Sequence, residues 1–114
     1  MSQYHAIFTV TAKASGAVTE KRFVDHNGAQ AGANANALGV AGASAADGEL
    51  LPVHVLGTAI VETGGAVNVG DPVSSDAQGR AVVTDGTTYT VKVGRAREAA
   101  SGAGEFIEVL LIPS

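Results

Sequence analysis

Residues 50–80 read LLPVHVLGTAIVETGGAVNVGDPVSSDAQGR, and the strand and turn signals in this stretch decide the fold class. From Val53 to Val61, apolar side chains occupy both faces of an extended chain, which predicts a strand covered on both sides. Gly64 and Gly65 predict a tight hairpin turn after it. Pro72 lacks an N–H and predicts a strand end or bend, and Asp76–Gly79 predicts a further turn. Short strands joined by turns indicate an all-β domain.

Further β-prone segments flank this stretch at residues 4–11, 18–24, 39–41, 88–93 and 106–112. The segment at residues 106–112 is the most apolar, so a central strand with both faces covered is expected there. Residues 25–38 are rich in alanine, asparagine and glycine, which predicts an exposed loop.

The length of 114 residues suits one domain. We expect residues 1–17 to form an N-terminal arm or edge strand and residues 18–114 to form a single β domain. The apolar segment at residues 4–11 leaves two alternatives open, a first strand in the domain's own sheet or an arm that reaches a neighbouring molecule. Aromatic residues make up only 4% of the chain. Because stabilisation follows buried apolar area, we expect oligomerisation to add to a modest core.

Composition excludes several functional classes. The chain has no cysteine, which rules out disulfides, thiolate metal sites and cysteine catalysis. Neither a secretory signal nor an apolar run long enough to span a bilayer is present, so no membrane contact is expected. The formal net charge is −4, with seven basic residues scattered among eleven acids, so no nucleic-acid partner is expected.

The side chains that could carry chemistry form no recognisable reaction centre. The histidines His5, His26 and His54 share no metal-ligand spacing. Residues Ser74–Asp76 indicate a polar turn rather than a catalytic group, and no serine lies in a nucleophile elbow. We therefore expect no catalytic residue, no metal site and no cofactor, which favours a structural or interaction protein over an enzyme.

Glycine-punctuated blocks follow one another in a fixed order: Gly28–Gln30, Leu38–Ala41, Ala46–Glu49, Val53–Ala59, Gly64–Val73, Asp76–Ala81, Val93–Ala96 and Ile107–Leu111. This order resembles that of the capsid cement, or head decoration, proteins of tailed bacteriophages. The resemblance extends over roughly residues 24–112.

The resemblance implies a small β-barrel or β-tulip-like domain with glycine-rich loops and an extended N-terminal arm. Its implied function is that of a structural virion protein, made in the host bacterial cytoplasm. Such a protein would bind the outer surface of the phage head and cement neighbouring major capsid subunits against internal DNA pressure. The implied partners are the major capsid protein and further copies of the chain, as a homotrimer or a dimer.

Candidate capsid or subunit contacts come from the N-terminal segment and from the second face of the central strand: Tyr4, His5, Ile7, Phe8, Val10, His54, Leu56 and Ile60. The residues also leave other functions open. One is a carbohydrate- or host-surface-binding β-domain of a virion or cell envelope. The other is a small β-clip enzyme, suggested by the corner that contains Asp71.

Overall fold

The computed structural model describes residues 6–33, 37–84 and 93–111, with residues 6–8 described in their backbone alone. These residues form eight strands and no helix, which confirms the all-β prediction. The strands are β1 Ala6–Lys13, β2 Phe23–Asp25, β3 Ala37–Ala41, β4 Leu50–Glu62, β5 Pro72–Ser75, β6 Ala81–Val83, β7 Gly94–Ala96 and β8 Phe106–Leu111. Most of the strand expected at residues 88–93 lies outside the described residues.

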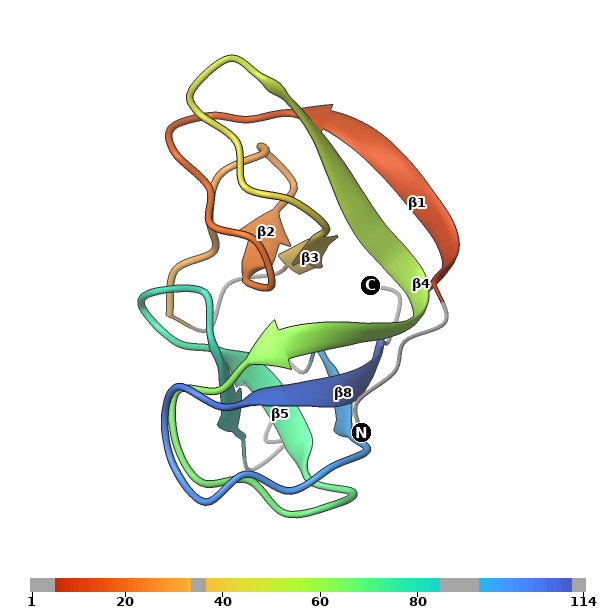
Figure 1. The fold of residues 1–114 in the computed structure, drawn as a ribbon, viewed down its shortest axis with the longest axis vertical. Coiled ribbons are helices and arrows are strands. Elements are labelled where there is room, and N and C mark those ends of the chain that lie inside the picture. The colour runs from red at the N-terminus through yellow and green to blue at the C-terminus, as the bar shows by residue number, and fades with distance from the viewer. Residues whose placement is uncertain (1–5, 34–36, 85–92, 112–114) are drawn as a thin grey trace.

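The longest strand, β4, bends sharply and belongs to both halves of the molecule (Figure 1). Its first half pairs with β1 on one side and β3 on the other, and its second half pairs with β8. Gly57 lies between the two halves with φ +94°, a conformation that side chains with a Cβ rarely adopt. The glycine therefore allows one strand to turn the corner between two parts of the sheet.

The strands form a nearly closed antiparallel sheet, in which the order β2-β3-β4-β8-β7-β5-β6 is completed by β1 on β4. This arrangement confirms the predicted small barrel-like domain. Residues 6–13 pair with β4 of their own chain. The division of the chain at residue 17 stays a prediction.

Buried side chains form two clusters, separated by the ribbon of β2 and β3. The upper cluster comprises Ala14, Val18, Val24, Ala41, Ala45, Leu51 and Val53. The lower cluster contains the other core residues, among them Phe23, Val40, Ala59, Val61, Ile107 and Val109. Successive residues of a strand point to opposite faces, so Phe23 and Val40 enter the lower cluster while Val24 and Ala41 enter the upper one. The ribbon thus contributes to both cores.

The hairpin expected at Gly64 and Gly65 does not form. Neither glycine takes a positive φ, and Val67 makes only an isolated bridge to Ala100. The partner of the second half of β4 is β8, which places Val61 opposite Ile107. The apolar run of β8 buries more surface against β4 than the short segment after Gly65 could, and burial decides the pairing.

Two other expectations from the sequence need correction. The strand expected at residues 18–24 is limited to β2, because the backbone turns at Lys21, where φ is +62°. The segment at residues 25–38 is not simply exposed, because Ala31 is buried in the lower cluster and donates its N–H to the Phe23 carbonyl. This segment therefore forms part of the fold.

Candidate interface surface

The second half of β4 and the adjacent β8 present an outer face that is partly apolar. Alternation on β8 sends Ile107, Val109 and Leu111 into the lower cluster. The outward residues pair across the two strands, and we call them the β4–β8 face: Thr58, Ile60, Glu62, Phe106, Glu108 and Leu110. In the single chain, Phe106 is 50% exposed and Leu110 is 45% exposed. The central position expected for this strand is confirmed, but the prediction that both its faces are covered is wrong for the single chain.

Charged groups around the β4–β8 face are largely paired with one another. Arg22 contacts Glu62 at 3.1 Å, and Arg97 contacts Glu108 at 3.3 Å. Lys21 lies with its ammonium 5.3 Å from the centroid of the Phe106 ring. Partly exposed ion pairs contribute little to stability, at most about 1 kcal/mol each. Their effect here is to cancel charge beside the exposed apolar groups.

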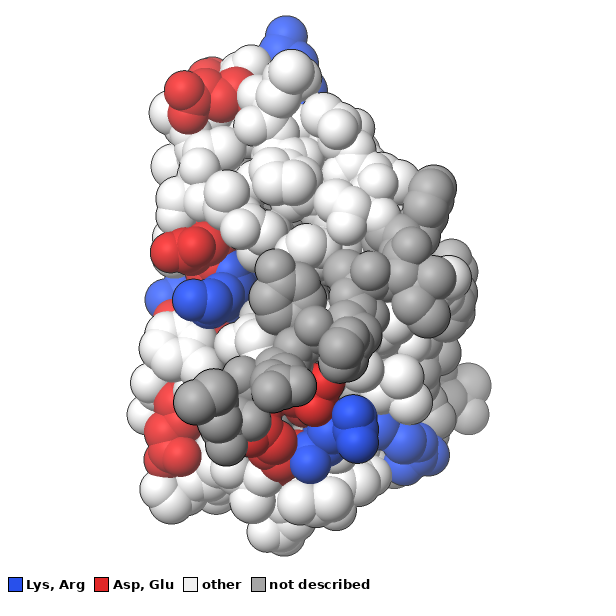
Figure 2. All heavy atoms as spheres, turned by 45° about the vertical axis from the view of Figure 1, so that its right-hand side comes forward, with Lys and Arg blue, Asp and Glu red and all other residues white. Residues whose placement is uncertain are grey.

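The first half of β4 and β1 form a second exposed area, which is poor in charge. On the face turned away from the upper cluster Thr9 lies opposite His54 and Thr11 lies opposite Pro52, whereas Lys13 and Leu50 end the ribbon. In Figure 2, charged side chains gather at the upper tip, and the surface directly below the tip is uncharged. The other edge of β1 pairs with none of the described strands. Such an edge can accept a strand from another chain.

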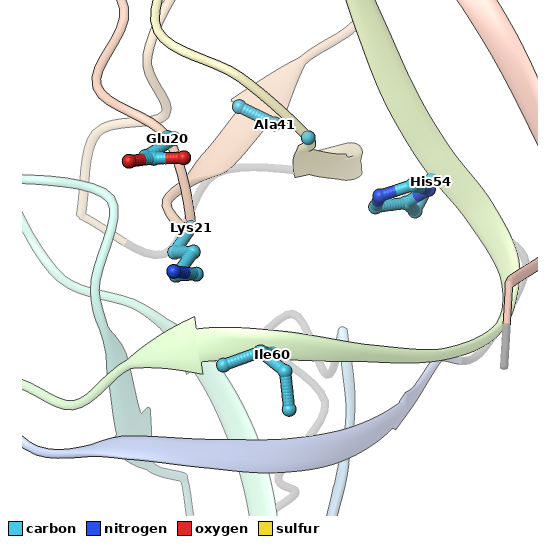
Figure 3. A pocket seen from close by; sticks show the side chains of 6 residues that line it. Glu20, Lys21, Ala41, His54 and Ile60 are labelled. Carbon is cyan, nitrogen blue, oxygen red and sulfur yellow. The ribbon is translucent and has the colours of Figure 1, made fainter. Parts of the chain in front are cut away.

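A pocket of about 260 Å³, which we call the corner notch, opens on the inner side of the β4 bend. Its lining residues are Glu20, Lys21, Ala41, Gly42, His54 and Ile60. Figure 3 shows the His54 ring projecting from the first half of β4 toward this space, with Ile60 on the second half of the strand below Lys21. The His54 ring is held by a hydrogen bond of 3.0 Å between its Nδ1 and the Thr9 hydroxyl. Burial lowers the pKa of His54 below its ordinary value of 6.5.

The structure places only some of the candidate contact residues on one surface. Tyr4 and His5 lie outside the described residues, and Ile7 and Phe8 are described in their backbone alone, with Phe8 opposite Leu56. Among the others, Val10 is partly buried against the upper cluster, Leu56 is 36% exposed, and His54 and Ile60 line the corner notch. Their role as contacts stays a prediction.

Three residues of the β4–β8 face and the corner notch are not among the contacts expected from the sequence, namely Lys21, Phe106 and Leu110. A signal for two of them was present, because Glu108 is the single charge in the apolar strand and shares its face with Phe106 and Leu110. A charge in such a run marks the side that points away from the apolar core, although Glu108 itself is only 8% exposed and is paired with Arg97. No comparable signal pointed to Lys21, because its position depends on the turn in the backbone.

Within residues 6–33, 37–84 and 93–111, no group of three or more His, Cys, Asp or Glu residues could hold a metal ion. Across the same ranges, no helix is long and apolar enough to cross a membrane. The described side chains also leave no buried polar atom without a hydrogen-bond partner. The polar interior of the described part is thus satisfied by the fold itself.

A nearly closed β domain whose polar interior is satisfied and whose outer surface is partly apolar has the character of a structural, interaction-forming protein. The family model described as phage cement protein matches residues 1–111, and the chain belongs to that family. It is therefore a capsid-associated structural protein of the virion surface, as the resemblance in sequence implied.

A solved structure supports the same assignment. The chain is similar to the head fiber gp8.5 N base of bacteriophage phi29, with a TM-score of 0.73 and 25% sequence identity. The match covers 92% of this chain and 93% of the phi29 chain. No curated protein sequence matches the chain.

Proposed function

We propose that the protein binds the outer surface of the phage head and cements neighbouring major capsid subunits against internal DNA pressure. Membership of the phage cement protein family and the likeness to a phi29 head fiber base support this function. The observation that carries the proposal is the β4–β8 face, where Phe106 and Leu110 stay about half exposed beside paired charges.

A single copy of this face is too small to hold a head subunit tightly. Full burial of a large apolar side chain contributes about 1.5–3 kcal/mol, so covering the exposed halves of Phe106 and Leu110 contributes about 2 kcal/mol in all. Association costs at least about 4 kcal/mol in lost freedom of motion. Additional contacts and several linked copies are needed, which supports an assembly of more than one chain.

We further propose that the chain acts as a homotrimer, with a dimer as the alternative. Closed symmetry would let one assembly contact several capsid subunits at once, and it could cover the open edge of β1. Size-exclusion chromatography with light scattering measures this directly. A chain that stays monomeric at the concentrations that decorate heads would contradict the oligomer.

Head binding is tested with expanded heads of the encoding phage made without this protein. The purified chain should co-sediment with expanded heads and not with scaffolded precursors. Phe106→Ser and Leu110→Ser should each weaken binding, whereas Val69→Ser, which alters another exposed apolar residue, should not. Absence of binding by the unaltered chain would refute the cement function.

Removal of residues 1–11 is a less informative test of the N-terminal segment. It would delete most of β1 and with it the pairing to β4 and the packing of Val10 on the upper cluster. Single changes at Tyr4, His5, Ile7 and Phe8 test the proposed contacts of this segment more directly. Loss of head binding with unchanged circular dichroism would support a contact role.

A function in glycan binding receives less support. Sugar sites of that kind need exposed aromatic rings, and the described aromatic side chains are those of Phe23 and Phe106. Phe23 is fully buried, and the Phe106 ring is in contact with the Lys21 ammonium. Glycan-array binding without any capsid present would favour this alternative.

A further inference from the structure

The corner notch combines apolar walls with one cation. Ile60 supplies apolar atoms, and the His54 ring supplies a flat wall between Thr9 and Gly42. A Cβ at Gly42 would lie 2.9 Å from Nε2 of His54, so the ring packs closely on that backbone. At about 260 Å³ the notch is smaller than the roughly 300–1,000 Å³ pockets of drug-sized ligands, and it suits a single side chain.

Lys21 occupies an unusual backbone conformation at the rim of this notch. It is the one non-glycine residue with positive φ in the described part of the chain. Two hydrogen bonds of 2.9 Å hold it there, from its own N–H to the Ala41 carbonyl and from the Glu62 N–H to its carbonyl. A glycine would adopt this conformation without strain, so what lysine adds is its side chain.

The ammonium of Lys21 has no carboxylate partner among the described residues, whereas Arg22 and Arg97 are both paired. Its contact is with the face of the Phe106 ring, which attracts a cation and leaves its charge uncancelled. Figure 3 shows the side chain descending from the loop toward the half of β4 that carries Ile60. Because burial lowers the pKa of His54, the ring across the notch is a neutral wall at neutral pH.

We propose that the corner notch receives the side chain of a glutamate or aspartate from a surface loop of a major capsid subunit, with Lys21 as its charge partner. This inference rests on the proposed cement function. The aliphatic part of the acid packs against Ile60 and the His54 ring, and its carboxylate meets the Lys21 ammonium. Glu20, also on the lining, carries the same charge as the incoming group and opposes it.

The test measures the binding of Lys21→Gln to expanded heads in the co-sedimentation assay. Loss of a hydrogen bond to a charged group predicts about tenfold weaker binding per site. Glu20→Gln should strengthen binding, because it removes the opposing charge. Lys13→Gln makes the same change as Lys21→Gln at an exposed lysine in β1, outside the notch, and should bind as the unaltered chain does.

Lys21→Gly distinguishes the role of the lysine side chain from that of the backbone conformation. Glycine tolerates the positive φ, so the variant should fold and still lose the same factor in binding. If Lys21→Gln and Lys21→Gly bind heads as tightly as the unaltered chain, the notch proposal is wrong and the cement function stands. If the unaltered chain does not bind heads, the cement function itself fails. A change in oligomeric state in either variant would assign the acid to a second copy of the chain, which also overturns the proposal.

Discussion

Gly39 of β3 lies directly against the backbone of His54 in β4, with no room for a side chain between them. A Cβ built on Gly39 would overlap the His54 carbonyl oxygen and lie 2.9 Å from the carbonyl carbon. The β3 backbone at this point also pairs with Val24 of β2. The strands β3 and β4 therefore approach each other here at a distance that only glycine allows.

Gly39→Ala should consequently destabilise the fold. The obstruction is backbone rather than a flexible side chain, so relief requires β3 and β4 to separate, and overpacking of this kind costs about 1–3 kcal/mol. Gly65→Ala is the matched control, because a Cβ there meets nothing within 4 Å and φ is not positive. Urea denaturation of both variants gives the comparison. Equal midpoints would show that the strands can separate without cost.

Thr63 lies in the buried turn after β4 and allows a second prediction about the stability of the fold. Its hydroxyl donates to the Gly102 carbonyl at 2.8 Å and accepts the Glu105 N–H at 3.1 Å, and the residue is fully buried. Thr63→Val keeps the shape but leaves both backbone groups without this partner, which should cost about 1–3 kcal/mol. Thr11→Val, at an exposed position of β1, should change stability little. A similar unfolding free energy for both variants would show that the turn relaxes to satisfy these groups.

Local turn chemistry could be predicted from the sequence because it depends on neighbouring residues. The turn at Asp76–Gly79 forms as expected, with Gly79 at φ +78°, and Pro72 begins β5 directly after the corner. The bend at Gly57 could not be predicted, because the surrounding alternation continues through it without interruption. The second half of β4 pairs with β8 rather than with the segment directly after it. This pairing depends on residues far along the chain, so it could not be predicted from the turn residues next to β4.

The candidate surface also has one part that could be predicted from the sequence and one that could not. Period-two alternation correctly placed His54 and Ile60 on one face of a strand, and both line the corner notch. That Lys21 reaches the same notch follows from a single φ value set by long-range hydrogen bonds. The location of Lys21 therefore depends on the whole fold, and it could not be predicted from residue spacing in the sequence.

Asp76 allows a prediction that separates turn formation from ion pairing. One carboxylate oxygen accepts the N–H groups of Gln78 at 2.9 Å and Arg80 at 2.8 Å, and the other pairs with the Arg80 guanidinium at 2.9 Å. Asp76→Asn retains an oxygen for the turn and should cost at most about 1 kcal/mol. Asp76→Ala loses both backbone bonds as well and should cost about 2 kcal/mol. Equal losses in the unfolding free energy would mean that the ion pair, rather than the turn, provides the stability.

His54 should make the stability of the fold sensitive to mild acid. Because burial lowers its pKa from the ordinary value of 6.5, the unfolded chain binds this proton more readily than the folded chain does. The free energy of unfolding should therefore fall as the pH drops below 6.5 toward the lowered pKa, and the His54 contribution should be complete above 6.5.

The measurement compares urea denaturation of the unaltered chain and His54→Asn across this pH range. Asparagine keeps a polar group near the Thr9 hydroxyl but does not titrate. Glu20 and Lys21 line the same notch in both proteins, so the difference between the two pH profiles isolates the imidazole. The unaltered chain should lose more stability on acidification than the variant. Parallel profiles would show that protonation of His54 is tolerated by the folded state, and its burial would then carry no acid sensitivity.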